Sequence, residues 1–127
     1  MAYTKGSRYT KIPGSDNKFL FASKEIQSPV YASTIDLAIT AEETIVDHAQ
    51  LTGDLTETVD IANSYTGDRL RCLYTTDGSV RTVTFSTNFI ADHAVIQDSS
   101  QLIIDFVFMG AVGTSGTWVE TSRKVFA

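Results

Sequence analysis

The sequence predicts an all-β protein, a single antiparallel β-sandwich or barrel-like domain preceded by an extended N-terminal arm. Apolar and polar residues alternate with a period of two in several short runs, as in strands with one buried face. Turn-forming residues separate these runs at intervals of about ten residues, as in sandwiches and barrels. The first 28 residues lack this periodicity and contain Gly, Pro, Ser and Asn instead. We therefore expect an arm over residues 1–28 and the β-sandwich domain over residues 29–127.

The arm and the body carry opposite net charge. Residues 1–28 contain five basic and two acidic residues, a net charge of +3, whereas residues 29–127 contain five basic and thirteen acidic residues, a net charge of −8. This segregation favours contact between the arm and an acidic surface of a neighbouring copy, another protein or nucleic acid, although charge also keeps a tail solvated. The candidate contact residues of the arm are aromatic or basic: Tyr3, Lys5, Arg8, Tyr9, Lys11, Phe19 and Phe21.

The strands of the body follow one another along the chain. The first lies within residues 31–40, and the same alternation recurs at 55–61, 69–74 and 81–85. Residues 102–109 form the longest and most apolar run, which makes them the candidate for a central strand. A final strand covers residues 118–123, and a single domain of this kind fits the length of 127 residues.

Residues 41–50 are ambiguous. Thr40 and Glu43 fit a capping box, and the following residues are long enough for three turns of helix. However, Thr44, Ile45 and Val46 are consecutive β-branched residues, which favour a strand. We expect a strand.

Two turns carry further signals. Asp77-Gly78 is typical of a tight hairpin turn with positive φ, and Arg81 at its mouth is a residue to test as a contact. The three glycines within residues 110–116 resemble a phosphate-binding loop, but no Lys-Ser/Thr pair follows them and a strand begins at Thr117. We expect a hairpin loop there.

The residues that carry chemistry do not form a recognisable catalytic or metal-binding pattern. His48 and His93, the only histidines, lack metal-ligand spacing, and we expect both to be exposed. Glu57 and Asp60 would face opposite sides of one strand. Cys72 is the only cysteine, so no internal disulfide forms. We expect no enzyme activity, no metal and no cofactor, and a β-sandwich hydrolase is the least favoured interpretation.

Composition also limits the partners. No apolar run approaches the roughly 20 residues that span a bilayer, so we expect no membrane association. The acidic body has too few arginines to neutralise several phosphates, which disfavours nucleic acid. Sugar binding needs only a few exposed aromatic residues on a β-scaffold, and Tyr65, Tyr74 and Trp118 are candidate platforms. Trp118, beside Val119 in a strand, fits core packing better.

Five short stretches of the body form a recognisable series: Asn63–Leu70 (NSYTGDRL), Thr75–Gly78 (TTDG), Arg81–Phe85 (RTVTF), Asn88–Phe89 and Thr117–Glu120 (TWVE). Together they resemble a pattern of structural proteins of tailed bacteriophages. In that family a Gly-Asp turn leads into a strand, an Asp-Gly turn follows, an Arg-Thr-Val-Thr-Phe strand comes next, and a long apolar strand and a loop precede Trp-Val-Glu. The resemblance covers about residues 34–123, whereas the arm and the length of the loop at 110–116 lie outside the pattern.

The resemblance implies a non-enzymatic virion protein that is assembled in the host cytoplasm. We expect a capsid decoration or auxiliary head protein that stabilises the shell through its arm. Its partners would be the major capsid protein and neighbouring copies of itself, with a homotrimer as one arrangement. The alternative is a receptor- or glycan-binding module of a head or tail fibre, because related domains occur in decoration proteins, head fibres and tail fibres alike.

Overall fold

The structure is a computed structural model that describes residues 9–11, 19–21, 24–98, 100–110 and 116–126. For residues 9–11 and 19–21 it describes the backbone pairing alone. Every regular element in these ranges is a strand, which confirms the all-β class. Among these residues no helix has the length and apolar character needed to cross a membrane.

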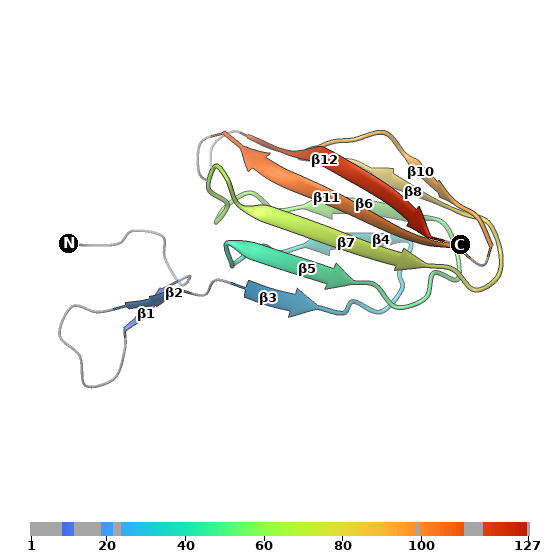
Figure 1. The fold of residues 1–127 in the computed structure, drawn as a ribbon, viewed down its shortest axis with the longest axis horizontal. Coiled ribbons are helices and arrows are strands. Elements are labelled where there is room, and N and C mark those ends of the chain that lie inside the picture. Colours follow the sequence, from blue (N-terminus) through green and yellow to red (C-terminus); the bar gives the residue numbers. More distant parts are fainter. Residues whose placement is uncertain (1–8, 12–18, 22–23, 99, 111–115, 127) are drawn as a thin grey trace.

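Two sheets lie face to face and form the body of the molecule, as Figure 1 shows. The front sheet has six strands in the order β3 (Lys24–Gln27), β5 (Glu43–Asp47), β7 (Arg69–Thr75), β11 (Gln101–Met109), β12 (Thr117–Phe126) and β9 (Phe89–Ile90). The back sheet has four strands in the order β10 (Ala94–Ile96), β8 (Arg81–Phe85), β6 (Leu55–Val59) and β4 (Thr34–Leu37). A separate pair consists of β1 (Tyr9–Lys11) and β2 (Phe19–Phe21), which are antiparallel.

From β3 to β8 the chain coils as a β-solenoid does. Successive strands alternate between the two sheets, so that each strand pairs in parallel with the strand two positions further along the chain. The coil ends where β7 and β8 meet later strands, because β11 pairs with β7 and β10 pairs with β8 in the antiparallel direction. The closing β12 is antiparallel to β11 and parallel to β9.

The expected antiparallel pairing is therefore wrong for the strands of the coil. The link at Asp77-Gly78 is not a hairpin, because it joins β7 in the front sheet to β8 in the back sheet. Gly78 nevertheless has the expected positive φ, 92°. Turn residues reverse the chain equally well within a sheet and between sheets, and a strand buries alternate residues in either case. The sequence pattern could not separate the two arrangements.

The core lies between the inner faces of the sheets. The predicted central strand is confirmed, because β11 lies between β7 and β12 and buries every second residue from Leu102 to Phe108. The expected strand at residues 41–50 is also confirmed as β5, whose Thr44 and Val46 are fully buried. β3 falls inside the expected arm of residues 1–28, yet it pairs with β5 at the edge of the front sheet.

Candidate functional site

The predicted contact residues of the arm divide into two groups. Tyr9 and Lys11 lie in β1 opposite Phe21 and Phe19 of β2, and this strand pair belongs to neither sheet of the body. Tyr3, Lys5 and Arg8 lie outside the described residues. The side chains of all these residues are likewise outside the described part, so the arm remains a predicted contact site.

The most concentrated set of titratable groups lies inside the core, where His48, Glu57 and Tyr74 meet. The Tyr74 hydroxyl donates to Oε1 of Glu57 at 2.5 Å, and Nε2 of His48 lies 2.8 Å from the same oxygen. The His48 ring stacks on the Tyr74 ring with centroids 4.3 Å apart. We call these three residues the buried polar cluster.

The protons of the cluster follow from its geometry. Nδ1 of His48 lies 3.0 Å from the carbonyl oxygen of Leu73, which only accepts, so Nδ1 carries a hydrogen. The contact between Nε2 and Glu57 then requires a second hydrogen, held by the imidazole or by the carboxyl group. In either case the donors of the cluster are matched by acceptors, as burial demands.

Burial controls the chemistry of the neighbouring groups. Desolvation, followed by the charge of Glu57, raises the pKa of the Cys72 thiol well above its usual value. Desolvation also raises the pKa of the Tyr74 phenol, with the adjacent Cys72 and Glu57 adding to the shift. Cys72, Glu57 and Tyr74 are at most 1% exposed. The side chains of the cluster are therefore closed off from solvent.

Two predictions about these residues are wrong. His48 was expected on the surface but is buried, because β5 continues its alternation one residue past Asp47. Tyr74, a candidate sugar platform, points into the core from β7. The informative signal was the spacing of Glu57 between Leu55 and Val59, which places a carboxylate on the buried face of β6.

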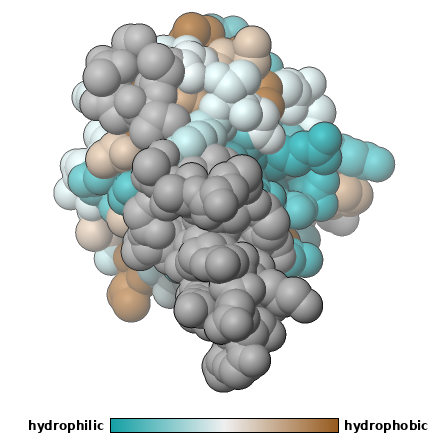
Figure 2. Space-filling view, turned by 90° about the vertical axis from the view of Figure 1, so that its left-hand side faces the viewer, coloured by the Kyte–Doolittle hydropathy of each residue, from teal (hydrophilic) through white to brown (hydrophobic). Residues whose placement is uncertain are grey.

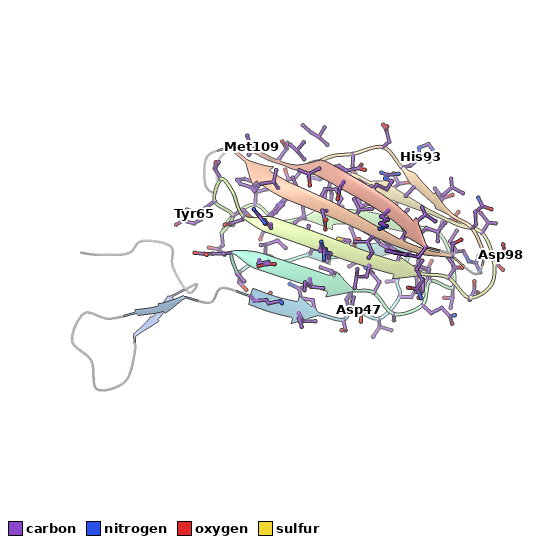
Figure 3. All side chains as sticks on the ribbon, viewed as in Figure 1. Asp47, Tyr65, His93, Asp98 and Met109 are labelled. Atoms are coloured by element: carbon purple, nitrogen blue, oxygen red, sulfur yellow. The ribbon has the colours of Figure 1, made fainter. Side chains whose placement is uncertain are left out.

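The other candidate side chains do not converge. Trp118 is fully buried, as the packing interpretation predicted. Tyr65 lies at one end of the body, whereas His93 lies towards the opposite end (Figure 3). Within the described ranges no group of three His, Cys, Asp or Glu side chains is arranged to hold a metal ion.

A hollow of about 430 Å³ lies on the outer surface of the front sheet. Arg71 and Asp105 form a two-pronged ion pair there, with Nε to Oδ1 at 2.7 Å and Nη2 to Oδ2 at 3.1 Å. Ser122 donates to the same carboxylate at 3.0 Å. The hydrogen bond from Arg71, with that from Ser122, lowers the pKa of Asp105. The hollow thus offers charged and hydroxyl groups for polar contacts.

The outer surface of the back sheet is different in chemistry. Thr34, Thr56 and Thr84 lie side by side across β4, β6 and β8, and Asp36 accepts a 2.7 Å hydrogen bond from Thr58 in the next row. Arg81 pairs with Asp77 at 2.8 Å across the link between the sheets. At the end of the molecule in Figure 2, apolar residues on the visible described surface are scattered spots and not one patch.

The comparisons add no relative. No protein-family model matches the chain, and no curated protein matches it.

Proposed function

We propose that this chain is a non-enzymatic structural protein of a tailed-bacteriophage virion, a capsid decoration or auxiliary head protein. In this proposal the two facing sheets act as one sandwich-like body on the outside of the shell. The N-terminal arm binds the major capsid protein or a neighbouring copy, and binding stabilises the shell by mass action.

The observation that carries the proposal is the separation of the arm from the body. The strand pair β1–β2 forms a sheet of its own, while the described strands of the coil and the later strands enclose a hydrophobic core. The arm is basic and the body is acidic, so the arm of one copy is attracted electrostatically to the acidic body of another copy in an assembly. The arm is attached to the body, forms its own strand pair and carries the opposite net charge. A segment of this kind is suited to joining two protein molecules.

The burial of titratable and aromatic side chains in the body supports the same function. Its concentrated titratable groups are sealed in the core, where they hold strands together. The fibre alternative, a glycan-binding module, required exposed aromatic platforms, and two of its three candidates, Tyr74 and Trp118, are buried. No observation of the described residues favours that alternative over shell attachment.

The test is addition of the purified protein to capsids that lack it, read by electron microscopy. We expect regular density on the shell with the full chain and its loss when residues 2–21 are deleted, a truncation that leaves β3 in place. Lys124→Gln, on the exposed part of β12, serves as a control for the loss of a basic charge from the body. Absence of density with the full chain would refute the proposal. Salt should weaken binding, because exposed charges are screened beyond about 10 Å at about 0.1 M.

A further inference from the structure

The coil has a regular pairing rule that stops at its N-terminal end. Strands β3, β5 and β7 stack in parallel in the front sheet, and β4, β6 and β8 stack in parallel in the back sheet. The first turn of the coil, β3 and β4, forms one edge of each sheet. Continuing the rule towards the N-terminus requires a strand beside β4, and within the described residues that position is unfilled.

The chain's own preceding strand is tethered too closely to fill it. Only residues 22–23 separate β2 from β3, whereas the links that cross between sheets in the coil run from five residues, 38–42, to nine, 60–68. Facing sheets lie about 10 Å apart, and each residue spans at most about 3.6 Å. The link of two residues has three Cα-to-Cα steps, about 11 Å when fully straight, so it reaches across only without any bend and leaves no residue to reverse the chain. In addition, β2 pairs with β1.

The open edge of β4 presents backbone groups that no described strand pairs. The carbonyls of Ser33 and Leu37 accept hydrogen bonds from β6 and the residue after it, at 2.8 Å each. Because backbone groups alternate along a strand, the amides and carbonyls of Thr34 and Asp36 point the other way, towards the open edge. The next outward carbonyl, that of Ala38, already accepts from Gln27 at 2.7 Å. Thr34 and Asp36 are both exposed.

The two edges of the first turn differ in their protection. β3 carries Lys24 and turns Glu25 inward, where Thr40 and Gln27 bond its carboxylate. A lysine and an inward charge are devices that prevent an edge from pairing with another chain. β4 has the sequence TIDL, with neither lysine nor proline. Of the two edges at this end, β4 is the one open to another strand.

Charge selects the occupant. Asp36 lies on this edge, and Asp54 and Asp60 flank the neighbouring β6, whereas β4 and β6 contain no basic residue. The segment of residues 1–21 contains four basic residues and one acidic residue. An extended basic segment beside this edge gains backbone hydrogen bonds and opposite charge together. The two-residue link keeps β2 of the same chain away from this edge, whereas β2 of another copy is not limited in this way.

We propose that the open edge of β4 is the docking site for the N-terminal segment, residues 1–21, of a second copy of this chain, which adds there as a strand. The proposal deepens the proposed function, in which the arm contacts a neighbouring copy, and it assigns the surface that the neighbour offers. In such an assembly the arm of each copy binds the body of the next copy. This head-to-tail contact forms either a closed ring or an open filament.

Disulfide trapping between two single variants tests the docking. Leu20→Cys and Thr34→Cys are prepared as separate full-length proteins, mixed and oxidised, so that any bond between the two new thiols joins two chains; the native Cys72 is buried. We expect a heterodimer by mass spectrometry, and at least tenfold less of it with Thr84→Cys, which is exposed on β8 two strands away. Equal trapping at both positions, or none, would overturn the proposal.

Sedimentation of the free protein supplies a second readout. The full chain should self-associate, and Asp36→Pro should weaken association at least tenfold, because it removes an edge amide without touching the ladder to β6. Asp36→Ala, which keeps the amide, should retain more of the association. The inference is contradicted if the full chain is monomeric. It is also contradicted if a double variant with Leu20→Cys and Thr34→Cys forms its disulfide only within one chain. Both experiments use the free protein without capsids. A negative result therefore contradicts the docking of the arm on β4 and does not test capsid binding.

Discussion

Glu57 is held in the core by hydrogen bonds with two residues that come from different segments. Tyr74 reaches it from β7, and His48 reaches it from the link that follows β5, so one carboxylate on β6 of the back sheet bonds both a front-sheet strand and this link. Glu57 is fully buried, and a carboxylate in such a position is tolerated only when its hydrogen bonds are complete. We interpret the cluster as a bond between the sheets that fixes their relative register.

Removing the carboxylate tests this role. Glu57→Ala leaves His48 and Tyr74 facing an uncompensated cavity, and we expect a loss of about 3–5 kcal/mol in the free energy of unfolding. Glu57→Gln retains an acceptor for Tyr74 and should lose less. Urea denaturation gives both values, with exposed Glu43→Ala as a control within about 0.5 kcal/mol of the original chain. Equal stability of Glu57→Ala and Glu43→Ala would show that the cluster contributes little.

Cys72 offers a separate measurement on the same core. Because burial raises the pKa of its thiol, the reactive thiolate is scarce as well as inaccessible in the folded chain. We expect a thiol reagent to label the native protein only at the rate of unfolding, and to label it at once in denaturant. Rapid labelling without denaturant would mean that the core opens locally near β7.

The sequence indicates which face of its strand Glu57 occupies, but not which residues Glu57 contacts. Leu55, Glu57 and Val59 share one face of a strand by simple alternation, and that face proved to be the buried one. His48 could not be placed in the same way, because it follows β5 and its burial depends on Glu57, Leu73 and Tyr74 meeting it from elsewhere in the chain. Contacts of this kind depend on how the coil brings separate segments of the chain together.

At the scale of the elements, β12 departs from a regular strand where it meets Asp105. Its register against β11 shifts between Asp105 and Phe106, and Thr121 is the additional residue. The Asp105 side chain accepts from Arg71 on β7 and Ser122 on β12, and its carbonyl accepts from Thr121 at 3.2 Å. One residue of the central strand thus joins its two neighbours at an irregular point, where ladder hydrogen bonds are interrupted.

The pH dependence of this contact follows from the lowered pKa of Asp105. A carboxyl group whose pKa is depressed by folding stabilises the fold above its unfolded value, about 3.9, and loses this contribution as the pH falls through the folded value. The pair is partly exposed, so Asp105→Asn should cost about 1 kcal/mol or less near pH 7. Near pH 2 the difference should shrink. Urea denaturation at both pH values, with Asp98→Asn as the control, measures it; a constant difference would contradict the ion-pair explanation.

The longer strands of the body were predictable from the sequence, whereas the short β3, β9 and β10 and the pairing partners were not. The alternation at residues 102–109 located β11 and its central place, and the β-branched residues at 44–46 located β5. Parallel pairing escaped prediction because a strand buries alternate residues whichever sheet its successor joins. Gly78 illustrates the limit: its positive φ was expected, but the same backbone conformation serves a hairpin and a link between sheets.

For the whole molecule, β3 joins the front sheet of the body, although the expected arm of residues 1–28 included it. β3 pairs with β5 along its four residues, and Gln27 on it bonds the carbonyl of Ala38 in the opposite layer. Val46, opposite Gln27 on the inner face of β5, is fully buried. β1 and β2, in contrast, share no sheet with the body. The body should therefore fold without residues 2–21 but not equally well without residues 2–28.

Two truncations, studied in dilute solution so that association does not contribute, test the boundary. Deletion of residues 2–21 should change the free energy of unfolding by no more than about 0.5 kcal/mol, because no body strand is removed. Deletion of residues 2–28 should lower it by at least about 2 kcal/mol, since it strips β3 from the sheet, uncovers part of Val46 and leaves the Ala38 carbonyl without its donor. Urea denaturation followed by circular dichroism measures both. Equal stability of the two truncated chains would place β3 with the arm, and a large loss from the shorter deletion would show that residues 2–21 pack against the body of their own chain.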